Sequence, residues 1–118
     1  MDLLDALRHT EGKTLEFKRD LSSPAGLLRT VVAFANTAGG VVLVGVEDGT
    51  RHVRGVADPF ALEERIASLI TDSIAPRLLP DLEILSYRKT HVVAVQVHRE
   101  IGTSPQDPKR RYFSTEAP

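Results

Sequence analysis

The sequence predicts a fold of the α/β class, bordering on α+β, with a mixed, mostly antiparallel sheet and about three helices packed on it. Three observations lead to this prediction. Stretches whose apolar residues recur at helical spacing alternate with stretches that are apolar at every second position or throughout. Glycine and proline clusters separate these stretches. The length of 118 residues suits a single domain over residues 1–118.

Composition and charge exclude several classes of protein. The chain is 42% hydrophobic and 26% charged, which is ordinary for a soluble domain. It has no cysteine, so disulfides and thiolate metal sites are excluded. Its longest apolar run, 41–46, is far too short to span a bilayer, and its first residues lack the features of a signal peptide. We therefore expect a cytoplasmic protein with no membrane partner.

The first elements are a helix, a strand and a second helix. Residues 2–8 predict a short helix, and the alternation of "TLEFK" at 14–18 predicts a half-buried strand with Glu16 and Lys18 on its outward face. Ser22 or Ser23, followed by Pro24, predicts the beginning of the next helix. This helix should end at Gly39 or Gly40. Its apolar residues have helical spacing: Leu27, Leu28, Val31, Phe34 and Ala35.

The remaining elements complete the sheet. The β-branched run 41–46 predicts a central strand, and "EDGT" with "RHVRGV" predicts that the chain returns as a hairpin. Asp58 and Pro59 begin a third helix, which Pro76 ends. "LEILSYR" and "HVVAVQVH" predict a hairpin around Lys89 and Thr90, with alternate valines facing the core. "RYFS" adds an edge strand.

Acidic residues near the first and central strands form the first candidate site. Glu11, Glu16 and either Glu47 or Asp48 supply hard oxygen ligands, which would suit Mg²⁺ or Mn²⁺ if they converge. Such an ion could activate water, and Lys18 could neutralise charge that develops on a phosphate. In the simpler alternative, Glu16 and Lys18 form a surface ion pair, and Glu47 with Asp48 belongs only to a turn.

The double glycine forms the second candidate site. Backbone N–H groups at Gly39 and Gly40 could approach a phosphate closely, with Asn36 as an additional donor. The spacing matches neither the Walker pattern nor the dinucleotide fingerprint, so ATP binding has little support from the residues. The simpler alternative is that these glycines end a helix and begin a strand.

Basic residues form the third candidate site, although the net charge of the whole chain is only −1. Arg51 and Arg54 lie on the first predicted hairpin, and Lys109, Arg110 and Arg111 lead into the aromatic Tyr112. Basic residues beside an aromatic suit contact with phosphates and stacking on a base. Two solvated loops are the simpler alternative.

Three motifs together resemble a known family. "TEGKTLEFKRD", "VVAFANTAGGVVLVGVEDG" and "RGV" occur in an order and at spacings similar to the Schlafen-type AlbA domain, and the resemblance spans about Leu3 to Ala117. The same family is also described as a divergent AAA domain and occurs at the front of many bacterial predicted transcriptional regulators. The end of this chain departs from the family, because "RYFSTEAP" has no Arg-x-Gly after its aromatic pair.

The resemblance implies a DNA-binding or, more broadly, nucleic-acid-binding domain of a bacterial transcriptional regulator. Its eukaryotic members cleave RNA with acidic residues in the matching motifs, which implies roles for Glu11, Glu16 and either Glu47 or Asp48. A divalent-metal-dependent endonuclease is therefore the alternative hypothesis, and an ATP-binding module is a weaker one. Uncovered sheet edges also make a homodimer a possible assembly. All of these hypotheses expect the acidic strand, the glycine bend and the first hairpin tip to form one concave surface that accepts phosphate.

Overall fold

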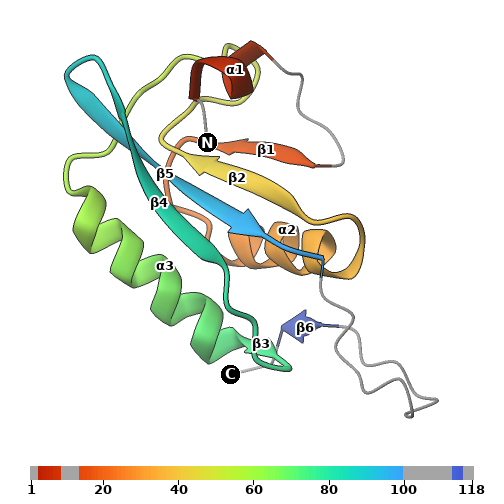
Figure 1. Cartoon of the computed structure of the whole chain (residues 1–118). Coiled ribbons are helices and arrows are strands. Elements are labelled where there is room, and N and C mark those ends of the chain that lie inside the picture. The colour runs from red at the N-terminus through yellow and green to blue at the C-terminus, as the bar shows by residue number, and fades with distance from the viewer. Residues whose placement is uncertain (1–2, 9–13, 100–112, 116–118) are drawn as a thin grey trace.

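The computed structural model describes residues 3–8, 14–99 and 113–115 (Figure 1). Its main sheet has the strand order β1-β2-β5-β4, formed by β1 (Leu15–Lys18), β2 (Gly40–Val44), β5 (Thr90–Val97) and β4 (Asp81–Tyr87). Strands β1 and β2 are parallel, whereas β2–β5 and β5–β4 are antiparallel. The prediction of a mixed, mostly antiparallel sheet in an α/β domain is therefore confirmed.

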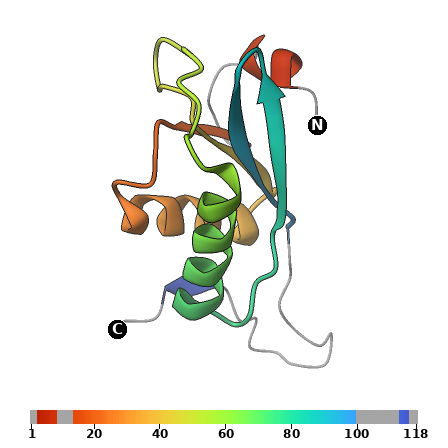
Figure 2. The same cartoon turned by 90° about the vertical axis from the view of Figure 1, so that its left-hand side faces the viewer.

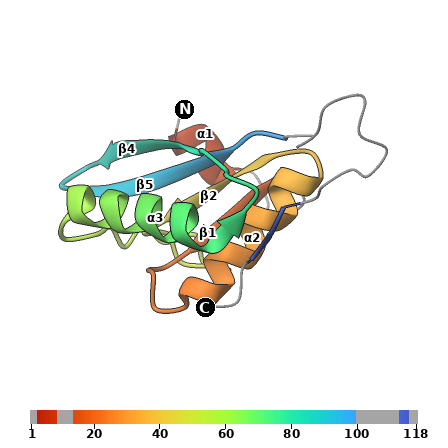
Figure 3. The ribbon, with the colours of Figure 1, turned by 90° about the horizontal axis from the view of Figure 1, so that it is seen from below.

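Helices cover both faces of this sheet, but unequally. Helices α2 (Pro24–Asn36) and α3 (Pro59–Ser73) pack on one face, and the short α1 (Leu3–Arg8) lies on the other, as the view from below shows (Figure 3). Figure 2 shows that α2 and α3 run in different directions across their shared face. None of the helices in the described residues is long and apolar enough to cross a bilayer.

Two apolar clusters, one on each face, result from the alternation of side chains in the strands. The α2 and α3 face buries alternate valines of β5, as predicted. The α1 face buries Leu15 and Phe17 of β1 together with Leu43 of β2. The side chains of β2 and β5 are buried on both faces, as expected for central strands. The sheet residues of the first cluster are Val42, Val44, Val93, Val95 and Val97.

The two long helices begin where the sequence predicts. The hydroxyl oxygen of Ser23 accepts a hydrogen bond from the N–H of Gly26 at 3.3 Å, and the carboxylate of Asp58 accepts one from Ala61 at 3.0 Å. A proline follows each cap, where its missing N–H costs nothing. These caps fix the first turns of α2 and α3.

The corner between α2 and β2 needs both of its glycines. Gly39 has a φ of +79° and donates its N–H to the Phe34 carbonyl at 2.8 Å, which caps the end of α2. A Cβ on Gly40 would lie 2.7 Å from the Phe34 ring. The simpler alternative, in which these glycines end the helix and admit the strand beneath it, therefore describes this corner.

Three sequence-based expectations differ from the structure. Residues 51–56 do not form a hairpin strand, because their pairing with the segment that follows β2 is limited to a single isolated bridge between Val46 and Val53. The β4–β5 turn is centred on Arg88 and Lys89, since Tyr87 pairs with Thr90. The last strand, β6 (Ser114–Thr115), does not join the main sheet. It pairs with β3 (Ile74–Ala75) in a separate small sheet that follows α3 (Figure 1).

Candidate functional site

Two groups of predicted site residues, the glycine corner and the acidic turn, lie at the two ends of β2. Gly39 precedes this strand and Gly40 is its first residue, whereas Glu47 and Asp48 follow it. At about 3.3 Å per residue, β2 alone separates the two groups by roughly 13 Å. The glycine corner and the acidic turn are therefore separated by the length of one strand, because the loops before and after a strand lie at its opposite ends. A single concave surface that includes both stays a prediction.

Glu16 and Lys18 lie on the face of the sheet that carries α2, since Leu15 and Phe17 between them are buried on the other face. The Lys18 Nζ atom is 3.8 Å from the Glu16 Oε1 atom, and both side chains are about 30% exposed. An ion pair of this exposure contributes less than about 1 kcal/mol. The surface pair that the sequence allowed as a simpler alternative is therefore present.

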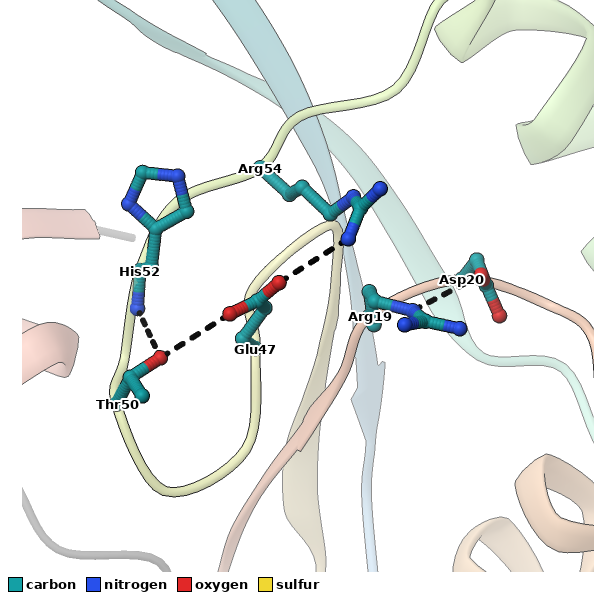
Figure 4. Close-up of polar contacts among 6 residues, drawn as sticks. All are labelled: Arg19, Asp20, Glu47, Thr50, His52 and Arg54. Carbon is teal, nitrogen blue, oxygen red and sulfur yellow. Dashed lines mark hydrogen bonds and ion pairs between the residues drawn. The ribbon is translucent and has the colours of Figure 1, made fainter.

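Glu47 is held inside its own loop (Figure 4). One of its carboxylate oxygens pairs with Arg54 Nη1 at 3.1 Å, and the other accepts a hydrogen bond from the Thr50 hydroxyl at 3.3 Å. The Thr50 oxygen in turn accepts the N–H of His52 at 3.2 Å. Asp48 stands exposed beside this network. The sequence predicted Arg54 as a phosphate ligand. In the structure, the ion pair with Glu47 partly neutralises the charge of Arg54.

The described carboxylates do not form a metal centre. Within residues 3–8, 14–99 and 113–115, no three His, Cys, Asp or Glu side chains gather closely enough to hold an ion. Glu11 lies outside the described residues. The Mg²⁺ or Mn²⁺ site built on Glu11, Glu16, Glu47 and Asp48 therefore stays a prediction.

Asn36 connects two distant parts of the chain. Its Nδ2 donates to the Phe113 carbonyl at 2.9 Å, and its Oδ1 accepts the Phe113 N–H at 2.8 Å. The Gly39 N–H is likewise engaged, with Phe34. The Asn36 side-chain amide has two N–H groups, and Phe113 occupies one of them. A phosphate at this corner could therefore accept a hydrogen bond only from the other N–H of that amide. Phosphate and ATP binding there stay predictions.

A groove of about 830 Å³ runs beside α2. Its lining includes Glu16 and Asn36, so the structure does bring these two predicted residues to one place. It also mixes charges, because Arg29 and Arg99 line it together with Glu16. A groove with both signs of charge has no clear preference for a polyanion.

A second, smaller hollow has a uniform charge, and we call it the basic pocket. Its volume is about 360 Å³, and in the described part of the chain its lining includes no acidic side chain. It forms between the loop after β2 and the β4–β5 turn. Its lining residues are Arg51, His52, Val53, Tyr87, Arg88, Lys89 and Thr90.

The topology of the sheet brings these two loops together. Because β2 and β5 are antiparallel, the end of β2 lies beside the start of β5, where Val44 pairs with Val93. The loop after β2 is then held in place by backbone hydrogen bonds. Arg54 and Gly55 donate to the Gly45 carbonyl at 2.8 and 2.9 Å, and Val56 donates to the His91 carbonyl at 2.9 Å.

The basic pocket also contains unusual backbone geometry. Arg51 and Arg88 have φ values of 60° and 52°, and they are the two non-glycine residues with positive φ in the described ranges. This conformation costs an L-residue roughly 1–2 kcal/mol. Arg51 also donates to the Leu7 carbonyl at 3.2 Å, which ties the pocket to α1.

The sequence predicted part of this pocket and missed part. Arg51 was predicted as a phosphate ligand, but Tyr87, Arg88 and Lys89 were missed because they belong to a hairpin turn 36 or more positions away. The available signal was an Arg-Lys turn where Asn-Gly is preferred. The other predicted basic residues, Lys109, Arg110 and Arg111 with Tyr112, lie outside the described residues.

A comparison with protein families decides where the chain belongs. The family described as Schlafen, AlbA_2 matches residues 11–115, which is nearly the whole chain. The chain is a member of the Schlafen, AlbA_2 family. The family that the sequence motifs resemble is therefore confirmed.

Solved structures share the fold of this Schlafen AlbA_2 domain. One is the N-terminal domain of a protein from Nitrosomonas europaea whose name relates it to the ATP-dependent DNA helicase RecG. It is 22% identical with a TM-score of 0.68, and the match covers 96% of this chain and 90% of that one. Another is the DIP2311 protein from Corynebacterium diphtheriae, 19% identical with a TM-score of 0.62 over 83% of this chain. The match spans only 21% of the DIP2311 chain.

Proposed function

We propose that this Schlafen AlbA_2 domain is a nucleic-acid-binding module that binds the phosphate backbone through the basic pocket. The observation that carries the proposal is the convergence of Arg51, Arg88 and Lys89 in one hollow with no acidic lining among the described residues. Arginine and lysine are the side chains that contact nucleic-acid phosphates most often. The name of the N. europaea protein, which refers to a DNA helicase, supports the same class of ligand.

The charge of the whole chain strengthens this argument. A net charge of −1 provides no general attraction to nucleic acid, so a localised cluster has to supply it. The cluster is distinct from the ion pair of Arg54 and Glu47, whose charges partly cancel. We further propose that the module serves a bacterial transcriptional regulator, as the sequence motifs imply.

The test is binding of fluorescently labelled tRNA, single-stranded DNA and duplex DNA, measured by anisotropy in EDTA. The wild-type chain is compared with K89Q and with the control R77Q. Arg77 is also exposed, and it precedes β4, at the other end of that strand from the pocket. K89Q should weaken binding by roughly tenfold. R77Q should bind like the wild type. Equal affinities for all three proteins would contradict the proposal.

The same material tests the nuclease hypothesis. Incubation with Mn²⁺ should leave every substrate intact if the domain only binds. Cleavage that EDTA and E16Q both abolish would instead establish the metal-dependent endonuclease. Binding to K89Q and cleavage by E16Q are separate readouts, so either function can be shown without the other.

A further inference from the structure

We propose that the basic pocket holds one unstacked base of a single-stranded nucleic acid against the Arg88 guanidinium, with Arg51 and Lys89 contacting the flanking phosphates. This inference rests on the proposed function and names its substrate class. It is argued from three features of the pocket: an arginine over an aromatic ring, the size of the hollow, and the backbone at two arginines.

The first feature is the placement of Arg88 over Tyr87. The Arg88 Cζ atom lies 5.4 Å from the centre of the Tyr87 ring, with Arg88 exposed and Tyr87 half-buried. Guanidinium planes and aromatic rings are the surfaces on which proteins stack bases of single strands. Because the ring already positions the guanidinium, less side-chain freedom is lost when a base stacks on it.

The second feature is the size of the hollow. About 360 Å³ is near the lower limit for a small-molecule site, so the pocket suits one planar group and no larger ligand. The bases of a duplex are stacked on one another and are not available to such a pocket. A duplex could offer it only phosphates, whereas a single strand offers a base and its phosphates together.

The third feature is the unfavourable backbone conformation of both arginines. A positive φ favours Gly or Asn, yet Arg51 and Arg88 occupy the two such non-glycine positions in the described chain, and both line this pocket. Unfavourable conformations of this kind gather at ligand sites. The neighbouring backbone is closely packed, because Gly55 lies directly against Thr90.

A single-stranded ligand also agrees with the regulatory role proposed above. The strand would be an RNA transcript or locally melted DNA, and both offer the same unstacked bases and phosphates. Contacts to bases and phosphates alone do not separate RNA from DNA. RNA and DNA versions of each probe therefore belong in the test.

The test compares three labelled probes of equal length: a single strand, its duplex, and a single strand whose central residues are abasic. The abasic probe keeps every phosphate and loses the bases. The wild-type chain should bind the intact single strand about tenfold more tightly than the abasic strand or the duplex. Equal affinity for the intact and abasic strands would overturn the inference while leaving phosphate binding in place. Failure to bind any probe would overturn the proposed function itself.

Variants locate the effect. R88N keeps a residue that tolerates positive φ, and Y87L keeps an apolar side chain beneath it. Both should reduce the preference for the intact strand over the abasic strand to about twofold or less. K89Q should weaken the binding of both probes equally and leave the preference for the intact strand unchanged. A preference unchanged in R88N and Y87L would overturn the assignment of the base to this pocket, and circular dichroism verifies that each variant is folded.

Discussion

Gly49 and Gly55 both have a positive φ, 85° and 75°, but their surroundings differ. A Cβ on Gly49 would meet nothing within 4 Å, whereas a Cβ on Gly55 would overlap the side chain of Thr90. Gly55 is therefore required by contact as well as by conformation. Through this contact, the loop after β2 packs against the start of β5, where Thr90 lines the basic pocket.

We expect G55A to destabilise the domain by about 2–4 kcal/mol, because the strain of positive φ is added to overpacking against β5. G49A has the same backbone strain without the overlap, and it should cost only about 1 kcal/mol. Urea unfolding followed by circular dichroism measures both. Equal losses for the two variants would show that the contact with Thr90 contributes nothing.

The carboxyl group of Asp20 provides a second test at the residue scale. Hydrogen bonds from the hydroxyl and N–H of Ser22 lower the pKa of Asp20 from its ordinary value of 3.8, and Arg19 adds a smaller effect of the same sign. The N–H contact is 2.9 Å long. Since the pKa is lower in the folded state, this carboxylate stabilises the fold above about pH 4 and loses that contribution as the pH falls through the folded pKa.

In S22A the pKa of Asp20 should rise toward 3.8, because the largest cause of its lowering is removed. The melting temperature of S22A should therefore fall less steeply than that of the wild type between pH 5 and pH 2. R19Q should raise the pKa of Asp20 by a smaller amount. Carboxyl carbon shifts in an NMR titration measure the pKa directly, and an Asp20 pKa unchanged in S22A would contradict the assigned cause.

Local signals explain why most elements were predicted correctly. The serine or aspartate caps with a following proline, the β-branched run before "EDG" and the alternation in β5 each act within a few residues. Partners far apart in sequence account for the errors. Residues 51–56 have the composition of a strand, but Gly45 and His91 take their backbone hydrogen bonds. In the small sheet, β3 pairs with the distant β6, and the residue before β6, Phe113, is bound by Asn36 across 77 positions.

The two ends of α3 provide a matched pair of substitutions. Asp58 caps the first turn, so D58A should destabilise the domain by about 1 kcal/mol. Asp72 lies in the last turn, where the helix dipole disfavours a negative charge, so D72A should be neutral or stabilising by a few tenths of a kcal/mol. Thermal unfolding of both variants measures the difference. A loss in D72A as large as that in D58A would show that removing any aspartate from α3 has this effect.

At the scale of the whole molecule, the topology explains why the candidate site was only partly predictable. The sequence shows Arg51 and Lys89. It does not show that β2 and β5 are antiparallel neighbours, which places the loops of these two residues at the same end of the sheet. The sequence also shows Glu16 and Asp48. It does not show that Glu16 lies on the sheet face that α2 covers, or that Asp48 follows the far end of β2. Charge clusters can be read locally, but their convergence is set by strand order.

The uneven distribution of charge predicts a specific response to salt. Because the net charge of the protein is −1, only the few cations of the basic pocket should contact phosphates. The affinity for nucleic acid should therefore decrease with salt concentration only as steeply as this small number of contacts predicts. K89Q should reduce the slope of log K against log salt by about 0.7 on a single strand, whereas R77Q should leave it unchanged. Anisotropy titrations between 50 and 200 mM salt, a range in which such effects are large, provide the measurement. Identical slopes for the two variants would indicate diffuse attraction without a localised site.

The position of β6 has a practical consequence. Thr115 pairs with Ile74 after α3, and the figures show this small sheet at the opposite end of the domain from the β4–β5 turn (Figures 1 and 2). The length of β4, roughly 20 Å, separates the two places. A fluorophore or a biosensor tether fixed at residue 115 would therefore leave the mouth of the pocket unobstructed, and surface immobilisation through that position should preserve its affinity for oligonucleotides.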